Sequence, residues 1–524
     1  MRVQFINPPF LPRFSRSHRM PAVIKSETMF YPCWLAQAAA RTEKRGHEID
    51  LIDCPPARMT LAALDTEIYK FRPELIVMES ATPSWYSDCE VATVIKRAHP
   101  RVKICLVGNH VTAMYTETME RGPAIDFIAL GEYDDTIAEI AAALEGKGDF
   151  SAIAGLVFRS GRSWERTPER PLLQHLDLLP WVSPIYQRFL NPWDYYFNLS
   201  HQPMVQIIAG RGCKSTCFFC ANPQISHGHA YRHRTAEDIA NEMAWIQENM
   251  PEIRQINFED ENFGDDRVFA RRLGEVARYR RVRLPFFANV RSYLDRSSLN
   301  ALKDAGLRIC SVGFDSLNTE LLYSMNKNQT EELSQAFMTH ARELGILVHG
   351  CFMFGFPGET QRSMRELLKF AYRLNPDSAQ FYPVMPYPGT GAYVYYRDRH
   401  YLATENFREW LTDHGMPRCV LNLPGLKPEE IDTFCDCAFI RFHFRPRYLF
   451  MKLIQAFRQP REGIRSLVAG LHFLHYLRNR LRMKTRSLRV RPAPMPNDWH
   501  EIPALPRGRM QEIEQARLPN NSQK

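Results

Sequence analysis

Three cysteines lie close together in the run Gly-Arg-Gly-Cys-Lys-Ser-Thr-Cys-Phe-Phe-Cys-Ala-Asn-Pro, at Cys213, Cys217 and Cys220. The spacing C-x-x-x-C-x-x-C puts three thiolates on one short loop, close enough to hold three irons of one cubane cluster. No fourth cysteine follows at ligand spacing, so one iron would stay open for a ligand from outside the protein. Clusters that only transfer electrons normally take four cysteines, and an open position on a metal is typical of catalysis. The triplet therefore indicates chemistry at the cluster.

A zinc site is the alternative for these cysteines. His227 and His229 follow a few residues later and could complete a set of zinc ligands. Zinc loops, however, usually come as two C-x-x-C pairs, so we favour the iron–sulfur interpretation.

Phe219 stands directly before the last cysteine, and with it the triplet resembles the signature of the radical S-adenosylmethionine (SAM) enzymes. The resemblance implies that a [4Fe-4S] cluster binds the amine and carboxylate of SAM at its open iron, with Phe219 close to the cofactor. It also implies reductive cleavage of SAM to a deoxyadenosyl radical, which removes hydrogen from an unactivated position. The protein's tasks are then to orient the reacting atoms and to exclude competing chemistry.

The composition is typical of a globular protein with two or three domains. The 524 residues are 45% hydrophobic, and the twelve cysteines are mostly scattered, which is not the pattern of a disulfide framework. An oxygen-sensitive cluster needs a reducing compartment, and the N-terminus lacks the apolar segment of a signal peptide, so we expect a cytoplasmic protein. No uninterrupted apolar run is long enough to span a bilayer.

Short apolar runs alternate with helical stretches in the first third of the chain. Helices are expected between the runs, for example over Trp34–Arg45 and Leu61–Phe71. This alternation predicts an α/β domain with a doubly wound parallel sheet, whose ligands bind beyond the carboxyl ends of the strands. The predicted strands are Val3–Ile6, Glu48–Ile52, Leu75–Met78, Ile104–Val107 and Phe127–Leu130.

The turns after these strands resemble those of the cobalamin-binding domain found in front of many radical SAM enzymes. Gly108-Asn109-His110-Val111 is similar to the turn after the fourth strand, and Gly131-Glu132 to the turn after the fifth. The resemblance implies that Gly108, Asn109, His110 and Val111 approach the corrin, and that Ser80, Thr82 and Ser84 line the pocket for the dimethylbenzimidazole tail. The motif D-x-H-x-x-G, which gives some cobalamin proteins a histidine ligand to cobalt, does not occur. The alternative is a vestigial flavodoxin-like domain that binds nothing.

A second alternation of strands and helices begins at Met204. About six β/α units fit a partial (β/α)6 barrel, with the site at the carboxyl ends of its strands. Thr235–Asn249 is expected to be a helix with a threonine cap and an acidic first turn. The predicted strands are Val205–Ala209, Ile256–Phe258, Phe286–Asn289, Ile309–Phe314, Val348–Phe354 and Ala379–Val384.

Polar residues follow several of these strands, and the family resemblance gives them roles. Glu259, Asp260 and Glu261 stand where family members place carboxylates near the SAM amino group. Asp315 and Ser316, in the run Gly-Phe-Asp-Ser, are implied to approach SAM. The run from Gly350 to Glu359 resembles the glycine-rich strand that passes the adenine and ribose. Gly355 lies within it, and a missing Cβ lets the backbone approach a ligand closely. The sequence itself does not identify a catalytic residue.

The predicted organisation has five parts. They are a cobalamin-binding-like domain over 1–145, a linker over 146–200, a radical SAM core over 201–395, a helical region over 396–485 and a disordered tail over 486–524.

The stretch from Arg441 to Arg491 is rich in Arg and Lys interleaved with aromatic and aliphatic residues, and it carries much of the net charge of +9. It predicts either helices packed on the main domain with a solvated outer face, or a peripheral contact with a membrane. We expect no nucleic-acid partner.

The resemblance as a whole favours a cobalamin-dependent methyltransferase. The opening Asn-Pro-Pro and the runs starting at Tyr31 and Asp53 resemble a branch of hopanoid-biosynthesis and natural-product radical SAM proteins. This implies methylation of an unactivated carbon of a lipid or natural-product intermediate, with a reducing partner such as flavodoxin or ferredoxin. Two alternatives stay open: an oxidative cyclase or rearranging enzyme that transfers no methyl group, and a sensor or assembly protein that only binds the cluster and cobalamin.

Overall fold

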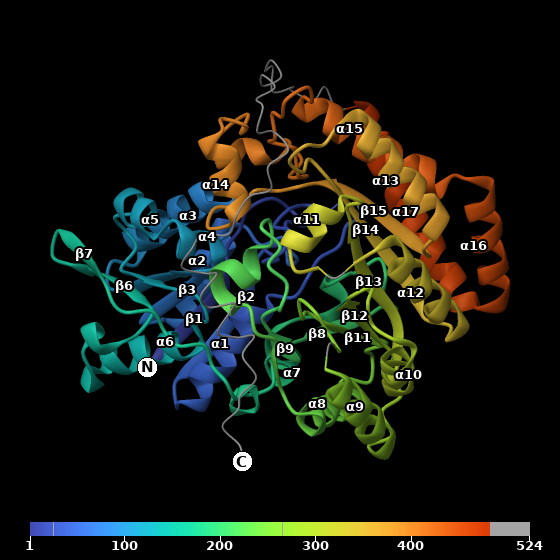
Figure 1. Ribbon diagram of the computed structural model, residues 1–524. Coiled ribbons are helices and arrows are strands. Elements are labelled where there is room, and N and C mark those ends of the chain that lie inside the picture. The colour runs from blue at the N-terminus through green and yellow to red at the C-terminus, as the bar shows by residue number, and fades with distance from the viewer. Residues whose placement is uncertain (25, 265, 328, 483–524) are drawn as a thin grey trace, which may run out of the picture.

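Two sheets lie side by side in the computed structural model, which describes residues 1–24, 26–264, 266–327 and 329–482 (Figure 1). The first sheet and its helices, blue to teal in Figure 1, form one half of the molecule. The second, green to yellow, forms the other half. The predicted tail over 486–524 lies outside the described residues.

The first sheet has seven strands. Its first five strands are parallel in the order 2-1-3-4-5 of flavodoxin-like doubly wound sheets, as the alternating apolar runs predict. Across the sheet the strands are β2 (Glu48–Asp53), β1 (Arg2–Asn7), β3 (Leu75–Glu79), β4 (Lys103–Val107), β5 (Phe127–Ala129), β6 (Leu156–Ser160) and β7 (Ser163–Arg166). The helices are α1 (Cys33–Lys44), α2 (Leu61–Phe71), α3 (Trp85–Ala98), α4 (Asn109–Ala113), α5 (Tyr115–Arg121) and α6 (Asp134–Ala142).

The hairpin of β6 and β7 lies within residues 146–200, which the sequence predicts to be a linker. Both strands are antiparallel to their neighbours and extend the first sheet. The apolar pair Val157–Phe158 and the turn at Gly161, whose φ is +61°, are the sequence features that explain the hairpin. This part of the predicted linker therefore belongs to the sheet.

The second sheet has six parallel strands and confirms the predicted partial barrel. It stays open, with β8 and β15 at its two edges. The strands are β8 (Met204–Ile207), β11 (Gln255–Phe258), β12 (Phe286–Val290), β13 (Leu307–Asp315), β14 (Leu347–Phe354) and β15 (Ser378–Pro383). The helices are α8 (Ala236–Asn249), α9 (Arg267–Tyr279), α10 (Arg296–Ala305), α11 (Thr319–Ser324), α12 (Glu331–Glu343), α13 (Gln361–Leu374) and α14 (Gly391–Asp398). As predicted, Thr235 caps α8, because its hydroxyl accepts from the backbone N–H of Asp238 over 3.2 Å.

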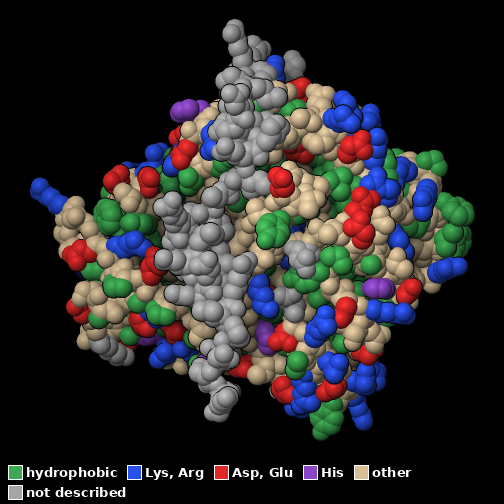
Figure 2. Space-filling view, in the orientation of Figure 1, with side chains coloured by type: hydrophobic (Ala, Val, Ile, Leu, Met, Phe, Trp, Pro, Cys, Tyr) green, Lys and Arg blue, Asp and Glu red, His purple; other side chains and the backbone are tan. Residues whose placement is uncertain are grey.

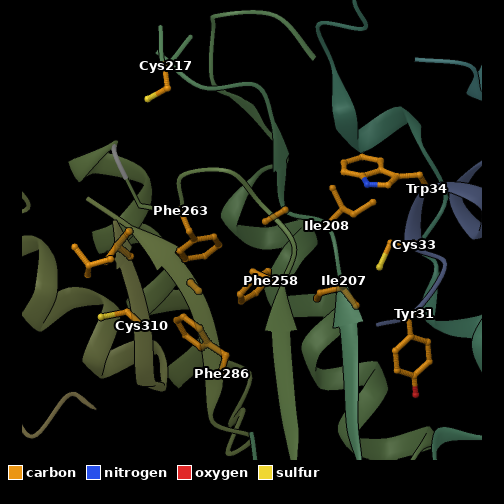
Figure 3. Close-up of a cluster of buried hydrophobic side chains, with 14 of the residues drawn as sticks. Tyr31, Cys33, Trp34, Ile207, Ile208, Cys217, Phe258, Phe263, Phe286 and Cys310 are labelled. Carbon is orange, nitrogen blue, oxygen red and sulfur yellow. The ribbon is translucent and has the colours of Figure 1, made fainter. Parts of the chain in front are cut away.

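A continuous apolar core joins the two halves. The Tyr31 ring, between β1 and α1, stacks on the Tyr195 ring at 3.7 Å, and the Tyr31 hydroxyl donates to the carbonyl of Met204 in β8 over 3.1 Å. Trp34 and Cys33, at the start of α1, lie beside Ile208, which directly follows β8 (Figure 3). The connection between the halves includes α7 (Ser183–Phe189). The apolar core therefore packs the two sheets against each other.

Three helices follow the second sheet: α15 (Pro428–His443), α16 (Pro446–Arg458) and α17 (Pro460–Arg482). Helix α15 packs against β15, and α16 packs against α17 on the outer side (Figure 1). In the described part of the chain, no helix is both long and apolar enough to cross a bilayer.

Candidate functional site

The cysteine loop lies beyond the carboxyl end of β8. Cys213 and Cys217 are buried and Cys220 is half-buried, and Figure 3 shows Cys217 beyond the arrowheads of the strands. The thiols share one neighbourhood: burial raises the pKa of Cys220, and the charges of Cys217 and Cys213 raise it further. The structure thus brings the three predicted ligands together.

Gln224 fixes the shape of this loop. Its side-chain N–H group donates to the carbonyls of Cys217, Phe218 and Cys220, over 3.0, 3.0 and 2.8 Å. Its side-chain oxygen accepts from the backbone N–H of Gly391 over 2.9 Å. One buried amide therefore ties the loop to the start of α14. Sequence reasoning missed Gln224, because nothing local distinguishes it from a surface glutamine.

Gly212, just before the first cysteine, is needed for the path of the loop. Its φ is +86°, and a Cβ there would lie 2.2 Å from the carbonyl oxygen of Ala230. Only glycine combines this backbone conformation with such a close approach.

Two cations that sequence reasoning missed stand beside the thiols. Arg291, directly after β12, donates from Nη2 to Cys213 Sγ over 2.9 Å. Lys327 forms a buried ion pair with Asp315 and donates to the carbonyl of Gly313 over 3.0 Å. Their signal in the sequence is weak, because single Arg and Lys residues in connecting segments, such as Arg291 after β12 and Lys327 after α11, are common. Positive charge here suits an anionic cluster of thiolates and iron.

The acidic turn after β11 is largely engaged by the protein itself. The Asp260 carboxylate accepts from the backbone N–H of Ala209 over 2.9 Å and from the Tyr231 hydroxyl over 2.8 Å, and burial raises its pKa to about 7. Glu259 is also buried and forms an ion pair with Arg19. These two carboxylates hold the turn in place.

Glu261 keeps a charge that faces the cysteine loop. Burial would raise its pKa, but His227, Arg19 and Asn222 outweigh burial and lower the pKa to about 2. Asn222 donates to Glu261 Oε1 over 2.8 Å, and His227 Nδ1 lies 2.9 Å from the same oxygen. His227 is therefore engaged by a carboxylate.

The glycine-rich end of β14 meets the cysteine loop through aromatic rings. The Phe356 ring lies 5.7 Å from that of Phe219. Gly355 has a φ of +100°, and the buried Glu359 carboxylate accepts from the backbone N–H groups of Gly355 and Phe356. Burial raises the pKa of Glu359 to about 7, although the two hydrogen bonds lower it.

Ser316, after β13, accepts from the backbone N–H of Asn318 over 3.1 Å.

Unpartnered polar atoms near the thiols fit the amine and carboxylate of SAM. Among the described residues, Glu261 Oε2 and Asn262 Oδ1 are buried acceptors without a hydrogen-bond partner, and Arg291 Nε is a buried donor without one. Two acceptors suit an ammonium group, and a guanidinium suits a carboxylate. In the described part of the chain, no three His, Cys, Asp or Glu side chains converge on one metal ion. A cubane cluster needs no such convergence, because each thiolate binds a different iron.

The predicted cobalamin residues gather at the carboxyl edge of the first sheet. His110 Nδ1 lies 3.1 Å from the Thr82 hydroxyl, and burial lowers the His110 pKa to about 3. Ser80 and Ser84 instead both donate to Asp88 Oδ2, over 2.8 and 2.7 Å. The other Asp88 oxygen accepts from Arg16.

Other predicted residues at this edge reach across to the second half. Asn109 donates to Asn222 Oδ1 over 2.8 Å, and Glu132 forms a buried ion pair with Arg232 over 2.6 Å. The Val111 side chain is fully buried in the domain core. Gly108 packs against the Ser80 carbonyl, which a Cβ would approach to 2.5 Å, whereas the space above Gly131 is open.

The polar groups at this edge suit cobalamin, but the hollows beside them are too small to hold it. Hydroxyls, side-chain amides and the buried, unpartnered His110 Nε2 suit the amide groups around a corrin. Two hollows at the junction, lined by described residues of both halves, have volumes of about 10 and 20 Å³, each enough for about one water molecule. Both are lined by residues Arg16 to His18 of the loop between β1 and α1, which separates the two halves at this point.

Two family profiles match these two halves. The profile of the B12 binding domain matches residues 20–141, and that of the Radical SAM superfamily matches residues 207–371. The chain belongs to the radical SAM enzymes that carry a B12-binding domain. This membership implies a [4Fe-4S] cluster, SAM and cobalamin as the cofactors of this radical SAM enzyme.

Curated relatives of this radical SAM enzyme include proteins of two named activities. An uncharacterized methyltransferase of Pyrococcus horikoshii is 27% identical over 425 residues, which cover 81% of this chain and 90% of the relative. An anaerobic magnesium-protoporphyrin IX monomethyl ester cyclase of Synechocystis sp. is 22% identical over 88% of this chain and 90% of its own length.

Solved structures share the fold of this radical SAM enzyme. The radical S-adenosylmethionine methyltransferase TsrM from Kitasatospora setae, with cobalamin and a [4Fe-4S] cluster bound, superimposes with a TM-score of 0.68 at 19% identity, over 85% of this chain and 89% of TsrM. The cobalamin-dependent radical enzyme OxsB gives a TM-score of 0.64 at 13% identity, over 92% of this chain and 75% of OxsB.

Proposed function

We propose that this radical SAM enzyme methylates an unactivated carbon of a lipid or natural-product intermediate. The observation that carries the proposal is the junction of its two halves. There, Asn109 of the B12-binding half bonds to Asn222, which bonds to Glu261 of the radical SAM half. The junction would bring the sources of the radical and of the methyl group together, so the reacting carbon of a substrate would have to extend to it. The methyltransferase named among the relatives supports the same activity.

The cofactors, when bound, supply a radical that removes a hydrogen atom and a methyl group that replaces it. The chain's own residues bind and orient. We propose that Cys213, Cys217 and Cys220 hold the cluster and that Arg291 stabilises the Cys213 thiolate by its hydrogen bond. Glu261 and Asn262 offer acceptors for the SAM amine.

For cobalamin we propose that Thr82, Asn109, His110 and the backbone at Gly131 contact the cofactor. Binding then requires the loop between β1 and α1 to move away from the junction, because the hollows there are small. Ser80 and Ser84 would act indirectly, through Asp88.

For the organisation of the chain we propose a cobalamin-binding domain over 1–145, a linker over 146–200 in which β6 and β7 extend that domain's sheet, a radical SAM core over 201–395 and a helical region over 396–485. The predicted tail over 486–524 is the fifth part of the chain in this proposal. We propose a reducing, cytoplasmic setting, because an oxygen-sensitive cluster needs one. A reducing partner such as flavodoxin or ferredoxin would supply electrons, and the outer helices would contact a membrane surface.

The test is anaerobic reconstitution with iron, sulfide and cobalamin, then incubation with reductant, SAM carrying a deuterated methyl group, and lipid and metabolite extracts. We expect deoxyadenosine together with a product that gains one labelled methyl group. Deoxyadenosine with a modified but unlabelled product would instead establish the cyclase or rearranging alternative, which the relatives named as cyclases favour. If no deoxyadenosine forms under any condition, the remaining alternative is a sensor or assembly protein that only binds the cluster and cobalamin.

A further inference from the structure

A cavity of about 450 Å³ runs along β15, at the open side of the barrel sheet. We call it the lateral cavity. Strand β15 and helices α15, α16 and α17 form most of its wall, and Ile24 and Leu199 also line it. Its volume lies within the range of about 300–1,000 Å³ that is typical of small-molecule sites.

The outer wall of the lateral cavity is apolar. Leu467, Leu471 and Leu474 of α17 line it at helical spacing, yet they remain 66, 56 and 54% exposed. Leu449 of α16 lines the cavity and is half-exposed as well. Leucines at this spacing usually face a packed core, so their exposure toward a cavity indicates a face that a ligand completes.

One end of the lateral cavity lies at the carboxyl ends of β14 and β15, at the edge of the sheet where the cysteine loop also lies. Tyr382, near the carboxyl end of β15, lines the cavity. Its pKa is raised well above the ordinary value, first by burial and then by the charges of Cys351, Asp315 and Cys220. Tyr382 pairs with Met353 of β14. Three residues further along the chain, the Phe356 ring lies 5.7 Å from that of Phe219 in the cysteine loop. A ligand in the cavity would meet the radical site at this end.

The opposite end of the lateral cavity is polar. Ser378, the first residue of β15, bonds to His349 over 2.8 Å between Oγ and Nδ1. Lys452 of α16 also lines the cavity, and it is half-buried. Four residue steps separate Ser378 from Tyr382, which corresponds to about 13 Å along the strand.

We infer that the lateral cavity binds the substrate, a mostly apolar molecule with one hydrogen-bond-accepting group at its polar end. The apolar body lies against the leucines of α17, the polar group meets Ser378 and Lys452, and the opposite end of the body reaches Tyr382. The inference rests on the proposed function for the reaction that the bound substrate undergoes. Binding in the cavity can be tested independently of that reaction. The apolar wall excludes highly charged molecules, because their charges would lose hydration without a partner there.

Binding is tested with the reconstituted full-length enzyme and cis-parinaric acid, a fluorescent fatty acid with an apolar chain and one carboxylate. We expect saturable binding at one site. In Leu471→Asp the affinity should be at least about tenfold lower, since the bound apolar chain would cover the new carboxylate and remove it from water. Leu474→Trp, which fills the cavity without adding charge, should also weaken binding. Phe457→Asp is the matched control, because Phe457 lies on α16, is 80% exposed and does not line the cavity.

The outcomes separate this inference from the proposed function. Equal binding by the wild-type chain and both cavity variants, or no saturable binding at all, overturns the inference even where SAM cleavage is normal. Binding that the cavity variants abolish, in a protein that forms no deoxyadenosine, upholds the cavity and overturns the proposed function. Iron content and circular dichroism report whether each variant is folded. Should Leu471→Asp fail to fold, Leu474→Trp alone decides.

Discussion

Asn109 and Asn222 join the two halves of the molecule through one side-chain hydrogen bond of 2.8 Å, in which the Asn109 amide donates. Asn222 in turn donates a hydrogen bond to Glu261, and the Ser226 hydroxyl donates to Asn109 Oδ1 over 2.6 Å. The turn after β4 is thereby tied to the segment that follows the cysteine loop. A neutral hydrogen bond contributes only about 1 kcal/mol net, so these links position the halves yet can open when a cofactor binds.

The cluster should depend on all three thiols. We expect Cys217→Ala to leave a folded protein with little iron and no formation of deoxyadenosine, because the loop is local and is anchored by Gln224. Iron analysis, circular dichroism and detection of deoxyadenosine after reduction check this. Cys437→Ala is the control, since Cys437 is exposed on α15 and should retain full iron content. Reductive cleavage of SAM by Cys217→Ala would refute the assignment of the ligands.

Arg291 should tune the reduction potential of the cluster. A cation that donates to a ligand sulfur stabilises the more negative, reduced cluster, so Arg291→Gln should make the potential more negative. Loss of about 1.4 kcal/mol of this stabilisation corresponds to about 59 mV for one electron. Potentiometric titration followed by electron paramagnetic resonance measures the shift. Arg272→Gln, on the exposed face of α9, should leave the potential unchanged, and an unchanged value in Arg291→Gln would exclude the role.

Cobalamin should bind without a protein histidine on cobalt. His110 is buried, bonded to Thr82 and kept neutral by a pKa of about 3, and its ring lies 5.0 Å from those of Trp85 and Phe407. We therefore expect cob(II)alamin spectra of the enzyme to lack nitrogen superhyperfine splitting, both in the wild-type chain and in His110→Ala. A splitting that His110→Ala removes would contradict the prediction. Failure of the wild-type chain to bind cobalamin would favour the vestigial domain.

The sequence predicts the strands well and the side-chain contacts poorly, for a physical reason. Apolar runs and turn residues act locally, so the strands end within a few residues of their predicted limits. Gln224 bonds to Gly391 and Arg291 bonds to Cys213, pairs that lie 167 and 78 residues apart in the sequence, and only the fold brings them together. Likewise, Val111 belongs to the short helix α4, whose inward face the sequence does not predict, and its side chain lies in the core and not at the surface where the corrin is expected.

Glu359 should make stability depend on pH. Its pKa of about 7 in the folded protein exceeds the ordinary value of 4.5, so the folded state holds a proton between these pH values that the unfolded state has lost. Stability therefore falls as the pH rises from about 4.5 to 7, and the full cost of about 3 kcal/mol applies above pH 7. Glu359→Gln removes this cost, because its amide oxygen still accepts from the backbone of Gly355.

Thermal unfolding of the cluster-free protein from pH 4.5 to 8 measures this effect. Glu359→Gln should unfold at a higher temperature than the wild-type chain above pH 7, and the difference should vanish near pH 4.5. Glu366→Gln, on the exposed face of α13, should follow the wild-type curve throughout. A Glu359→Gln advantage that grows toward low pH would show that the carboxyl is not protonated in the folded state.

The outer face of α16 should hold the enzyme reversibly on an anionic membrane. Phe450 and Phe457 are 65 and 80% exposed there, and Figure 2 shows green side chains gathered over this helix with blue Lys and Arg side chains among them. Basic residues near anionic lipid contribute about 1 kcal/mol each, so several suffice for reversible binding. Co-sedimentation with liposomes that contain phosphatidylserine should therefore be strong at low salt and weak at high salt, where the charges are screened.

Phe457→Asp should reduce binding at low salt, whereas Tyr279→Asp, on an exposed position of α9, should not. Absence of salt-sensitive binding would mean that α16 and α17 only cover the barrel.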